Sequence, residues 1–100
     1  MIDLEEKYLV EIKRILAEYV PDCEVRAFGS RIEGKARKFS DLDLALVGIE
    51  KLDWRKIELL KDTFSATNIP IIIDVIDFNA ISDEFRKIIE NNYEIIQRRK

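Results

Sequence analysis

The chain has 100 residues, of which 47% are hydrophobic and 37% are charged, and its formal net charge is −3. This length and balance predict one globular domain, residues 1–100, with a real core. The acidic charge argues against duplex nucleic acid as a partner. No apolar run approaches the ~18 residues that span a bilayer, and the acidic start lacks an export signal. We therefore expect a cytoplasmic protein without membrane contact.

The supply of reactive side chains is narrow. The chain contains no histidine, and Cys23 is its one cysteine. Histidine bases, histidine nucleophiles and the usual zinc sites are therefore excluded, and a lone thiol fits a reducing compartment. Catalysis would have to use carboxylates, hydroxyls, lysines, arginines or a metal held by oxygen.

Hydrophobic periodicity predicts elements in the order helix, strand, helix, strand, helix over the first two thirds of the chain. We expect a helix at 3–19 with Asp3 and Glu6 as its capping box, a strand at 23–28, a short helix from Ser30 to about residue 36, a turn at 38–40, a strand at 41–47, and a helix from the cap Asp53 to about residue 66. Trp54, Ile57, Leu60 and Phe64 would form the apolar stripe of that last helix.

The remaining third adds a strand and a helix. Residues 69–78 are apolar on both faces, which predicts a central strand covered on both sides. Ser82 would cap a helix whose one face carries Phe85, Ile88, Ile89 and Asn92. Residues 93–96 either continue that helix or form a short edge strand. The whole pattern predicts an α/β (α+β) fold, a small mixed sheet with covering helices in the order α-β-α-β-α-β-α.

Asp41 and Asp43 are the first candidate site residues. Two residues apart on a strand, they would point to the same face with Cα atoms roughly 6.6 Å apart. Adjacent carboxylates repel each other, and a divalent cation between them removes that penalty. The alternative is an edge strand with a solvated acidic face.

Asp74 favours the metal interpretation. It lies in the most apolar run of the chain, where an unpaired carboxylate costs several kcal/mol. If the third strand lies beside the second, Asp74 joins Asp41 and Asp43 in an oxygen-only site suited to one or two Mg²⁺ ions. Asp77 would point to the opposite face and more simply caps the following turn.

Gly29-Ser30 is a candidate anion-binding turn between a strand and a short helix. Glycine admits a close ligand, and amides at a helix start attract anions. Arg31, Lys35, Arg37 and Lys38 make the following segment basic within an acidic protein. A phosphate-rich ligand beside the metal site would explain both features. The alternatives are an ordinary turn and a solvated loop.

Together these residues form the pattern G-S-x-x-x-G-x-x-x-x-x-S-D-x-D over residues 29–43. This pattern resembles that of the DNA polymerase β-like nucleotidyltransferase superfamily, and the short chain resembles its minimal nucleotidyltransferase (MNT) branch over essentially its full length. Ile32-Glu33 stands where many members have Ala-Arg. The resemblance implies that Gly29 and Ser30 hold the nucleoside triphosphate, with Arg31 and Ser40 also binding the nucleotide. It further implies that Asp41, Asp43 and Asp74 are catalytic metal ligands.

The resemblance also implies a function. Members of this branch are typically antitoxins paired with a helical HEPN protein, and some transfer AMP from ATP to a tyrosine of that partner. We therefore expect a Mg²⁺-dependent nucleotidyltransferase, with ATP or another NTP as donor and a HEPN-type protein as acceptor. The alternative is a non-catalytic module that neutralises the HEPN toxin by binding it. Transfer to a small molecule would need a substrate domain that this chain lacks.

Overall fold

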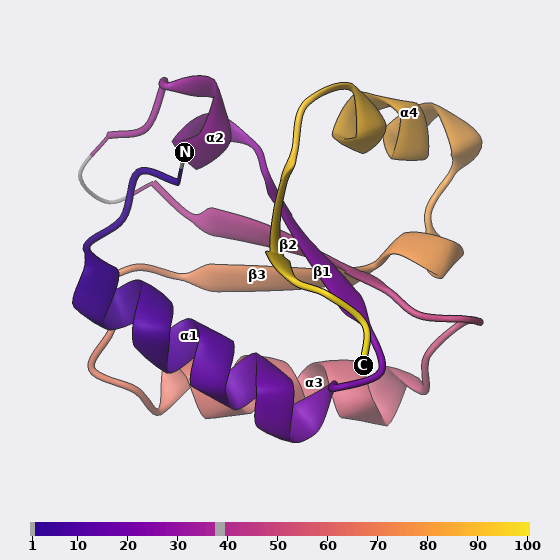
Figure 1. Cartoon of the computed structure of the whole chain (residues 1–100), viewed down its shortest axis with the longest axis horizontal. Helices are drawn as coiled ribbons and strands as arrows, with labels where there is room; N and C mark the ends of the chain where they lie inside the picture. Colours follow the sequence, from indigo (N-terminus) through magenta and orange to yellow (C-terminus); the bar gives the residue numbers. More distant parts are fainter. Residues whose placement is uncertain (1, 38–39) are drawn as a thin grey trace.

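A mixed four-stranded β-sheet with helices on both sides organises the computed structural model, which describes residues 2–37 and 40–100 (Figure 1). In chain order the described elements are α1 (Glu6–Tyr19), β1 (Glu24–Phe28), α2 (Ser30–Glu33), β2 (Leu42–Val47), α3 (Trp54–Ser65), β3 (Ile73–Asp77), the 3-10 helix η1 (Phe78–Ala80), α4 (Asp83–Asn91) and β4 (Glu94–Gln97). This confirms the predicted order and α/β class. The C-terminal strand β4 settles the alternative left open for residues 93–96.

The strands lie in the order β3-β2-β1-β4. β1 pairs antiparallel with both β2 and β4, whereas β2 and β3 run parallel. The pairing places Phe28 opposite Asp43 and Asp43 opposite Asp74, so a single row of side chains crosses three strands on one face of the sheet.

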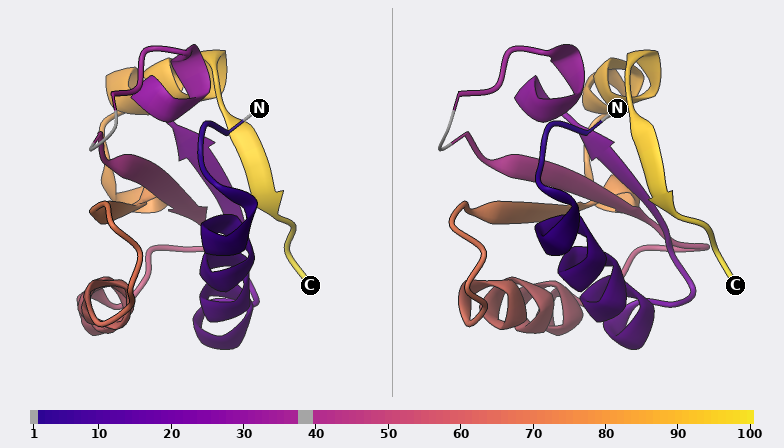
Figure 2. Two further views of the ribbon diagram at one scale, coloured as in Figure 1. Left: turned by 90° about the vertical axis from the view of Figure 1, so that its left-hand side faces the viewer. Right: turned by 60° about the vertical axis from the view of Figure 1, so that its left-hand side comes forward.

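The hydrophobic core lies on the other face of the sheet. Figure 2 shows α1 and α3 side by side on one side of the molecule, with α2 and α4 on the opposite side. Residues of α1 and α3 and alternate residues of the strands form one buried cluster, which includes Ile12, Leu16, Val25, Leu42, Leu44, Leu46, Leu60, Phe64 and Val75. Because successive side chains of a strand point to opposite faces, Asp43 and Asp74 lie on the face opposite the core. Burial alternates strictly along β3, whereas in β2 Ala45 on the other face is buried as well.

The expectation that the third strand is central is wrong. β3 is an edge strand and begins only at Ile73, with Ile72 before it 67% exposed. The long apolar run has two origins. Ile69 and Ile71 pack on the core from the loop, and within β3 only alternate residues are buried.

Two of the three predicted helix caps are confirmed. Asp53 accepts a hydrogen bond from Arg55 N, and Ser82 caps α4 as predicted. The Asp3 capping box is wrong, because α1 begins after Glu5 without a side-chain cap. Asp3 instead donates its backbone N–H to the carbonyl of Arg31 at 3.0 Å. The N-terminal segment is therefore tied to the loop that follows β1.

The predicted helix stripes also need correction. Trp54 in the first turn of α3 is 70% exposed, whereas Ile57 packs on the core and Leu60 and Phe64 are buried. On α4, Ile88 is exposed and Ile89 is buried. α2 ends at Glu33 rather than near residue 36, since Gly34 takes a left-handed conformation with φ +75°. No described helix is long and apolar enough to cross a membrane.

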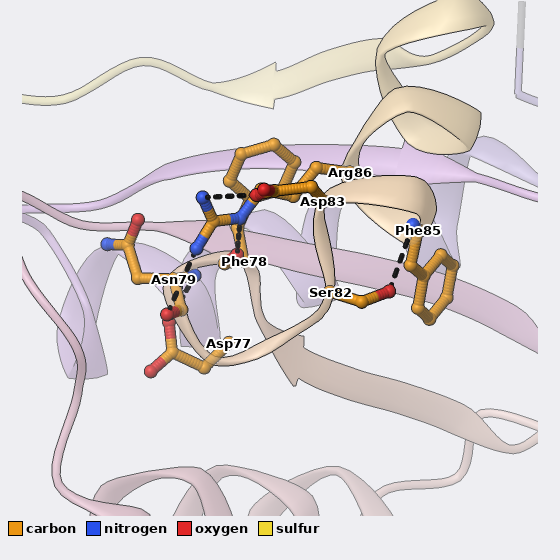
Figure 3. Close-up of polar contacts among 7 residues, drawn as sticks. All are labelled: Asp77, Phe78, Asn79, Ser82, Asp83, Phe85 and Arg86. Carbon is orange, nitrogen blue, oxygen red and sulfur yellow. Dashed lines mark hydrogen bonds and ion pairs between the residues drawn. The ribbon is translucent and has the colours of Figure 1, made fainter.

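The turn from β3 into α4 is held by side chains (Figure 3). Arg86 donates to the carbonyl oxygens of Phe78 at 3.0 Å and Asn79 at 3.2 Å. The Ser82 hydroxyl accepts from the Phe85 backbone N–H at 3.2 Å. These contacts fix the start of α4 against the end of β3, and the ring of Phe85 points away from the Arg86 guanidinium.

Candidate active site

Asp43 and Asp74 are brought together by the parallel pairing of β2 and β3, where they are direct partners in register. Partial burial raises the pKa of the Asp43 carboxyl, and the negative charges of Asp74 and Asp41 raise it further. Negative charge is therefore concentrated on the face that the sequence predicts for the acids.

Asp41 lies at the entrance to this face rather than within it. β2 begins at Leu42, so the exposed Asp41 immediately precedes the strand. Its charge nevertheless contributes to the raised pKa of Asp43. The structure thus places the three predicted acids on the same end of the β2–β3 pair.

The apolar run around Asp74 predicts that its side chain is buried, but the structure shows it partly exposed. Its side chain is 49% exposed, and Asp74 Oδ1 lies 4.0 Å from Lys61 Nζ of α3. The inference that Asp74 is a buried charge in need of a partner is therefore wrong. Its exposure follows from the position of β3 at the edge of the sheet, where water and Lys61 both reach it.

Asp77 is the buried acid of β3. Its carboxylate accepts from Leu52 N at 2.7 Å and from Asn79 N at 3.0 Å. Those hydrogen bonds join the segment before α3 to the end of β3. The prediction that Asp77 caps the following turn, on the face opposite Asp74, is confirmed.

Gly29 makes the close approach that the sequence predicts for this turn, but the approach is to a carboxylate. It has φ +87°, and a Cβ added there would lie 2.5 Å from Asp43 Oδ2. Only glycine fits both conditions. Ser30 then begins α2, as predicted. Gly29 and Asp43, fourteen residues apart in sequence, are therefore in direct contact.

Arg31 and Ser40 hold the loop around this turn. Arg31 is buried, and its guanidinium donates to the carbonyl oxygens of Asp3 and of Ser40, the latter at 2.9 Å. The Ser40 hydroxyl accepts from Arg37 N at 2.8 Å. The structure gives both residues a supporting role, and their contact with a nucleotide stays a prediction. Lys38 and most of the predicted turn at 38–40 lie outside the described residues.

The acids fit a hard divalent cation by their chemistry. All three offer oxygen ligands, which Mg²⁺ prefers, and a cation beside Asp43 would offset the charge that raises its pKa. In the described ranges, 2–37 and 40–100, no group of three or more histidine, cysteine, aspartate or glutamate side chains is arranged to hold a metal ion. The possible donors are thus the paired Asp43 and Asp74 with Asp41 beside them.

Sequence reasoning missed two features of the site. Lys61 gives no signal, because a lysine on an amphipathic helix is ordinary and only the edge position of β3 brings it to Asp74. A cavity between α2 and α4, lined in part by Gly29 and the rings of Phe28 and Phe85, was also missed. A larger cavity of about 440 Å³ between α1 and α3 contains none of the predicted site residues.

Comparisons with known proteins agree with this geometry. A family model described as "Polymerase beta, Nucleotidyltransferase" matches residues 10–100. A protein of Haemophilus influenzae named "Probable protein adenylyltransferase MntA" is 42% identical over 99 residues, covering 99% of this chain and 87% of the relative.

Solved structures share the fold. A chain of a toxin–antitoxin crystal structure with AMP-PNP matches with a TM-score of 0.72 at 19% identity, covering 92% of this chain and 73% of that one. A chain of a complex between a tri-AMPylated Shewanella oneidensis HEPN toxin and an MNT antitoxin matches with a TM-score of 0.63 at 16% identity, covering 93% of this chain and 71% of that one.

Proposed function

Because this chain belongs to the polymerase β nucleotidyltransferase family, we propose that it transfers AMP from ATP to a hydroxyl group of a partner protein. The observation that carries the proposal is the contact between Gly29 and Asp43, with Asp74 paired beside them. That arrangement unites a glycine turn suited to phosphates with carboxylates suited to a cation. The relative named as a probable protein adenylyltransferase supports the same chemistry.

Each site residue has a defined task in the proposal. Gly29 and Ser30 bind the triphosphate, with Arg31 and Ser40 supporting the nucleotide. Asp41, Asp43 and Asp74 would hold Mg²⁺, which supplies charge neutralisation at the transferring phosphoryl group. Asp74 also accepts the proton of the attacking hydroxyl. The new bond forms between that oxygen and the α-phosphorus of ATP. The bond between the α-phosphorus and the oxygen that bridges to the β-phosphorus breaks, and pyrophosphate is released.

The acceptor is proposed to be a tyrosine of a helical HEPN-type toxin, which makes this chain a cytoplasmic antitoxin. Support comes from the MNT antitoxin complex with a tri-AMPylated HEPN toxin, whose fold this chain shares. Residues 1–100 would act as one minimal nucleotidyltransferase domain. A chain of this size has little surface for an acceptor site of its own, so a second chain is a natural supplier.

The test is incubation of this protein with its co-expressed partner, Mg²⁺ and ATP labelled at the α-phosphate. We expect label on the partner with the native chain and none with Asp41→Asn/Asp43→Asn. Absence of label with the native chain would overturn the proposal, as would undiminished labelling by the double variant.

A growth assay separates catalysis from simple binding. If transfer neutralises the toxin, the Asp41→Asn/Asp43→Asn variant fails to rescue cells that express the partner, although a pull-down still recovers the complex. Full rescue by that variant would show that the domain acts by occluding the toxin instead.

A further inference from the structure

The cavity between α2 and α4 opens directly beside the proposed triphosphate turn. It has a volume of about 350 Å³, within the range of small-molecule pockets, and Gly29 forms part of its wall. Gly29 also lies against the carboxylate of Asp43. A ligand with phosphates on the Gly29 turn can therefore reach from the acids into this cavity.

The apolar part of the cavity is aromatic. Phe28 at the end of β1 and Phe85 in the first turn of α4 meet edge to face, with ring centroids 5.9 Å apart and planes at 81°. Ile88, one turn further along α4, lines the same cavity and is largely exposed. Aromatic rings in this position suit the flat face of a nucleobase, which stacks on them whatever its identity.

The polar part of the cavity is made of neutral amides and one acid. Asn91 and Asn92 at the end of α4 line it, and neither amide side chain is hydrogen-bonded within the ranges 2–37 and 40–100. Glu33 at the end of α2 lines the same cavity. An asparagine amide can donate to and accept from the same edge of adenine, where the amino group and N7 lie side by side.

The Asn91 amide distinguishes adenine from guanine in this setting. Its oxygen can accept from the 6-amino group of adenine while its nitrogen donates to N7, whereas guanine places the acceptor O6 where adenine has that amino group. The Glu33 carboxylate can accept from an exocyclic amino group of either purine, so the selection falls to the amide.

The wall that carries Phe85 is firmly placed. Ser82 caps α4 through the Phe85 backbone N–H, and Arg86 binds the carbonyl oxygens of Phe78 and Asn79 at the end of β3 (Figure 3). Because β3 also carries Asp74, the same anchor fixes the aromatic wall relative to the acids. A pocket that is already formed binds without a large ordering cost.

We propose that this cavity is the base-binding subsite for the adenine of ATP, with Phe85 stacking on the base and Asn91 selecting it. The inference rests on the proposed function in that the triphosphate lies on the Gly29 turn. It adds the residues that determine which nucleotide the enzyme uses.

The test compares binding of ATP, GTP and inorganic tripolyphosphate to the full chain with Mg²⁺, by isothermal titration calorimetry. Phe85→Leu keeps apolar volume but removes the ring, and we expect it to weaken ATP binding about tenfold or more while leaving tripolyphosphate binding within about twofold. Asn91→Ala should lower the preference for ATP over GTP by about tenfold. Glu90→Ala, an exposed neighbour on α4 outside the cavity, is the matched control and should change neither.

A second variant guards against a folding defect in Phe85→Leu. Ile88→Trp changes an exposed residue and fills the cavity, so it should also weaken ATP binding and spare tripolyphosphate. Undiminished ATP binding in both variants would overturn the inference, as would an equal loss for ATP and tripolyphosphate.

The outcomes also separate this inference from the proposed transfer reaction. Selective loss of ATP binding without label on any partner would leave the base subsite in place and remove the transferase. Label on the partner, together with unchanged ATP binding by the cavity variants, would support the transferase and overturn the base subsite. If the cavity variants keep ATP but lose the partner in a pull-down, the cavity is a protein-docking site.

Discussion

The two faces of β2 show how one strand serves both the fold and the site. Leu42, Leu44 and Leu46 are fully buried in the core with α1 and α3. Asp43 lies between them on the other face, beside Asp74 and against Gly29. The core face is held by packing, whereas the acid face brings carboxylates together, with Lys61 paired to Asp74 at its edge. Changes on the two faces should therefore separate stability from activity.

Asp43→Asn should have the largest effect on activity. Removal of a metal-binding carboxylate costs several kcal/mol of charge stabilisation, so we expect AMP transfer to fall by roughly 10³-fold. The fold should not suffer, because burial and the charges of Asp74 and Asp41 disfavour the ionised form. Labelled transfer and thermal unfolding, measured on one preparation, check both halves.

The sign of the pH effect follows from the same shift. A pKa that is higher in the folded than in the unfolded chain gives a contribution to stability that is full below the unfolded pKa. That contribution is lost as the pH rises through the folded pKa. At neutral pH the asparagine variant should be at least as stable as the native chain. A clear drop in its melting temperature would contradict this account of the acid face.

Leu44→Ala should have the opposite profile. Leu44 is fully buried, and removing its side chain from a packed core costs about 2–5 kcal/mol. For a domain of this size each kcal/mol lowers the melting temperature by about 4–8 °C. Leu59→Ala on the exposed side of α3 is the control and should lower it much less. Activity of the folded fraction of Leu44→Ala, assayed well below its melting temperature, should stay near native.

Gly29→Ala tests the contact that joins the turn to the acids. The added Cβ would lie 2.5 Å from Asp43 Oδ2, and the backbone at φ +87° and ψ −159° disfavours alanine by about 1–3 kcal/mol. Gly34→Ala is a matched control, since Gly34 has φ +75° but nothing within 4 Å of an added Cβ. Gly29→Ala should lose more stability in chemical denaturation than Gly34→Ala, because Gly29 has ψ −159° and Gly34 is in the ordinary left-handed region with ψ 18°. Only Gly29→Ala should lose transfer activity, and equal activity of the two variants would remove the contact from the mechanism.

These contrasts also explain what the sequence could predict. Alternation along residues 41–47 identifies both the buried leucines and the side on which Asp43 lies, because a strand has a fixed period of two. The Ser82 and Asp53 caps are local in the same sense, since each side chain binds an N–H two or three residues away. The pairing of Asp43 with Asp74 was predicted on the condition that their strands are neighbours, and the structure meets that condition.

The errors concern long-range arrangement. Apolar composition around Asp74 suggested a central strand, but composition does not distinguish a covered strand from an edge strand preceded by an apolar loop. Asp3 matches a capping box in the sequence, but its backbone N–H and C=O are both hydrogen-bonded to Arg31, twenty-eight residues away. The cavity with Phe85 depends on how α4 returns over the sheet, which no local pattern in residues 83–91 determines.

Lys61 lies at the boundary between the core face and the acid face, and its substitution should have the smallest effect on stability of the changes considered. It belongs to α3 on the core side but reaches round the edge strand to Asp74, and its amine also lies 3.8 Å from Glu58. Both ion pairs are solvent-exposed, so Lys61→Ala should change the free energy of unfolding by about 0.5 kcal/mol or less.

The informative readout is the Mg²⁺ requirement of transfer. A cation that binds Asp74 must compete with the Lys61 amine, so Lys61→Ala should lower the Mg²⁺ concentration for half-maximal activity by roughly two- to fivefold. Lys56→Ala, an exposed lysine on the same helix that forms no ion pair within the described ranges, is the control. A higher Mg²⁺ requirement in Lys61→Ala would mean that Lys61 instead helps to orient Asp74 for the ion. An unchanged requirement would place Asp74 outside the metal site and leave it only the proton of the acceptor hydroxyl.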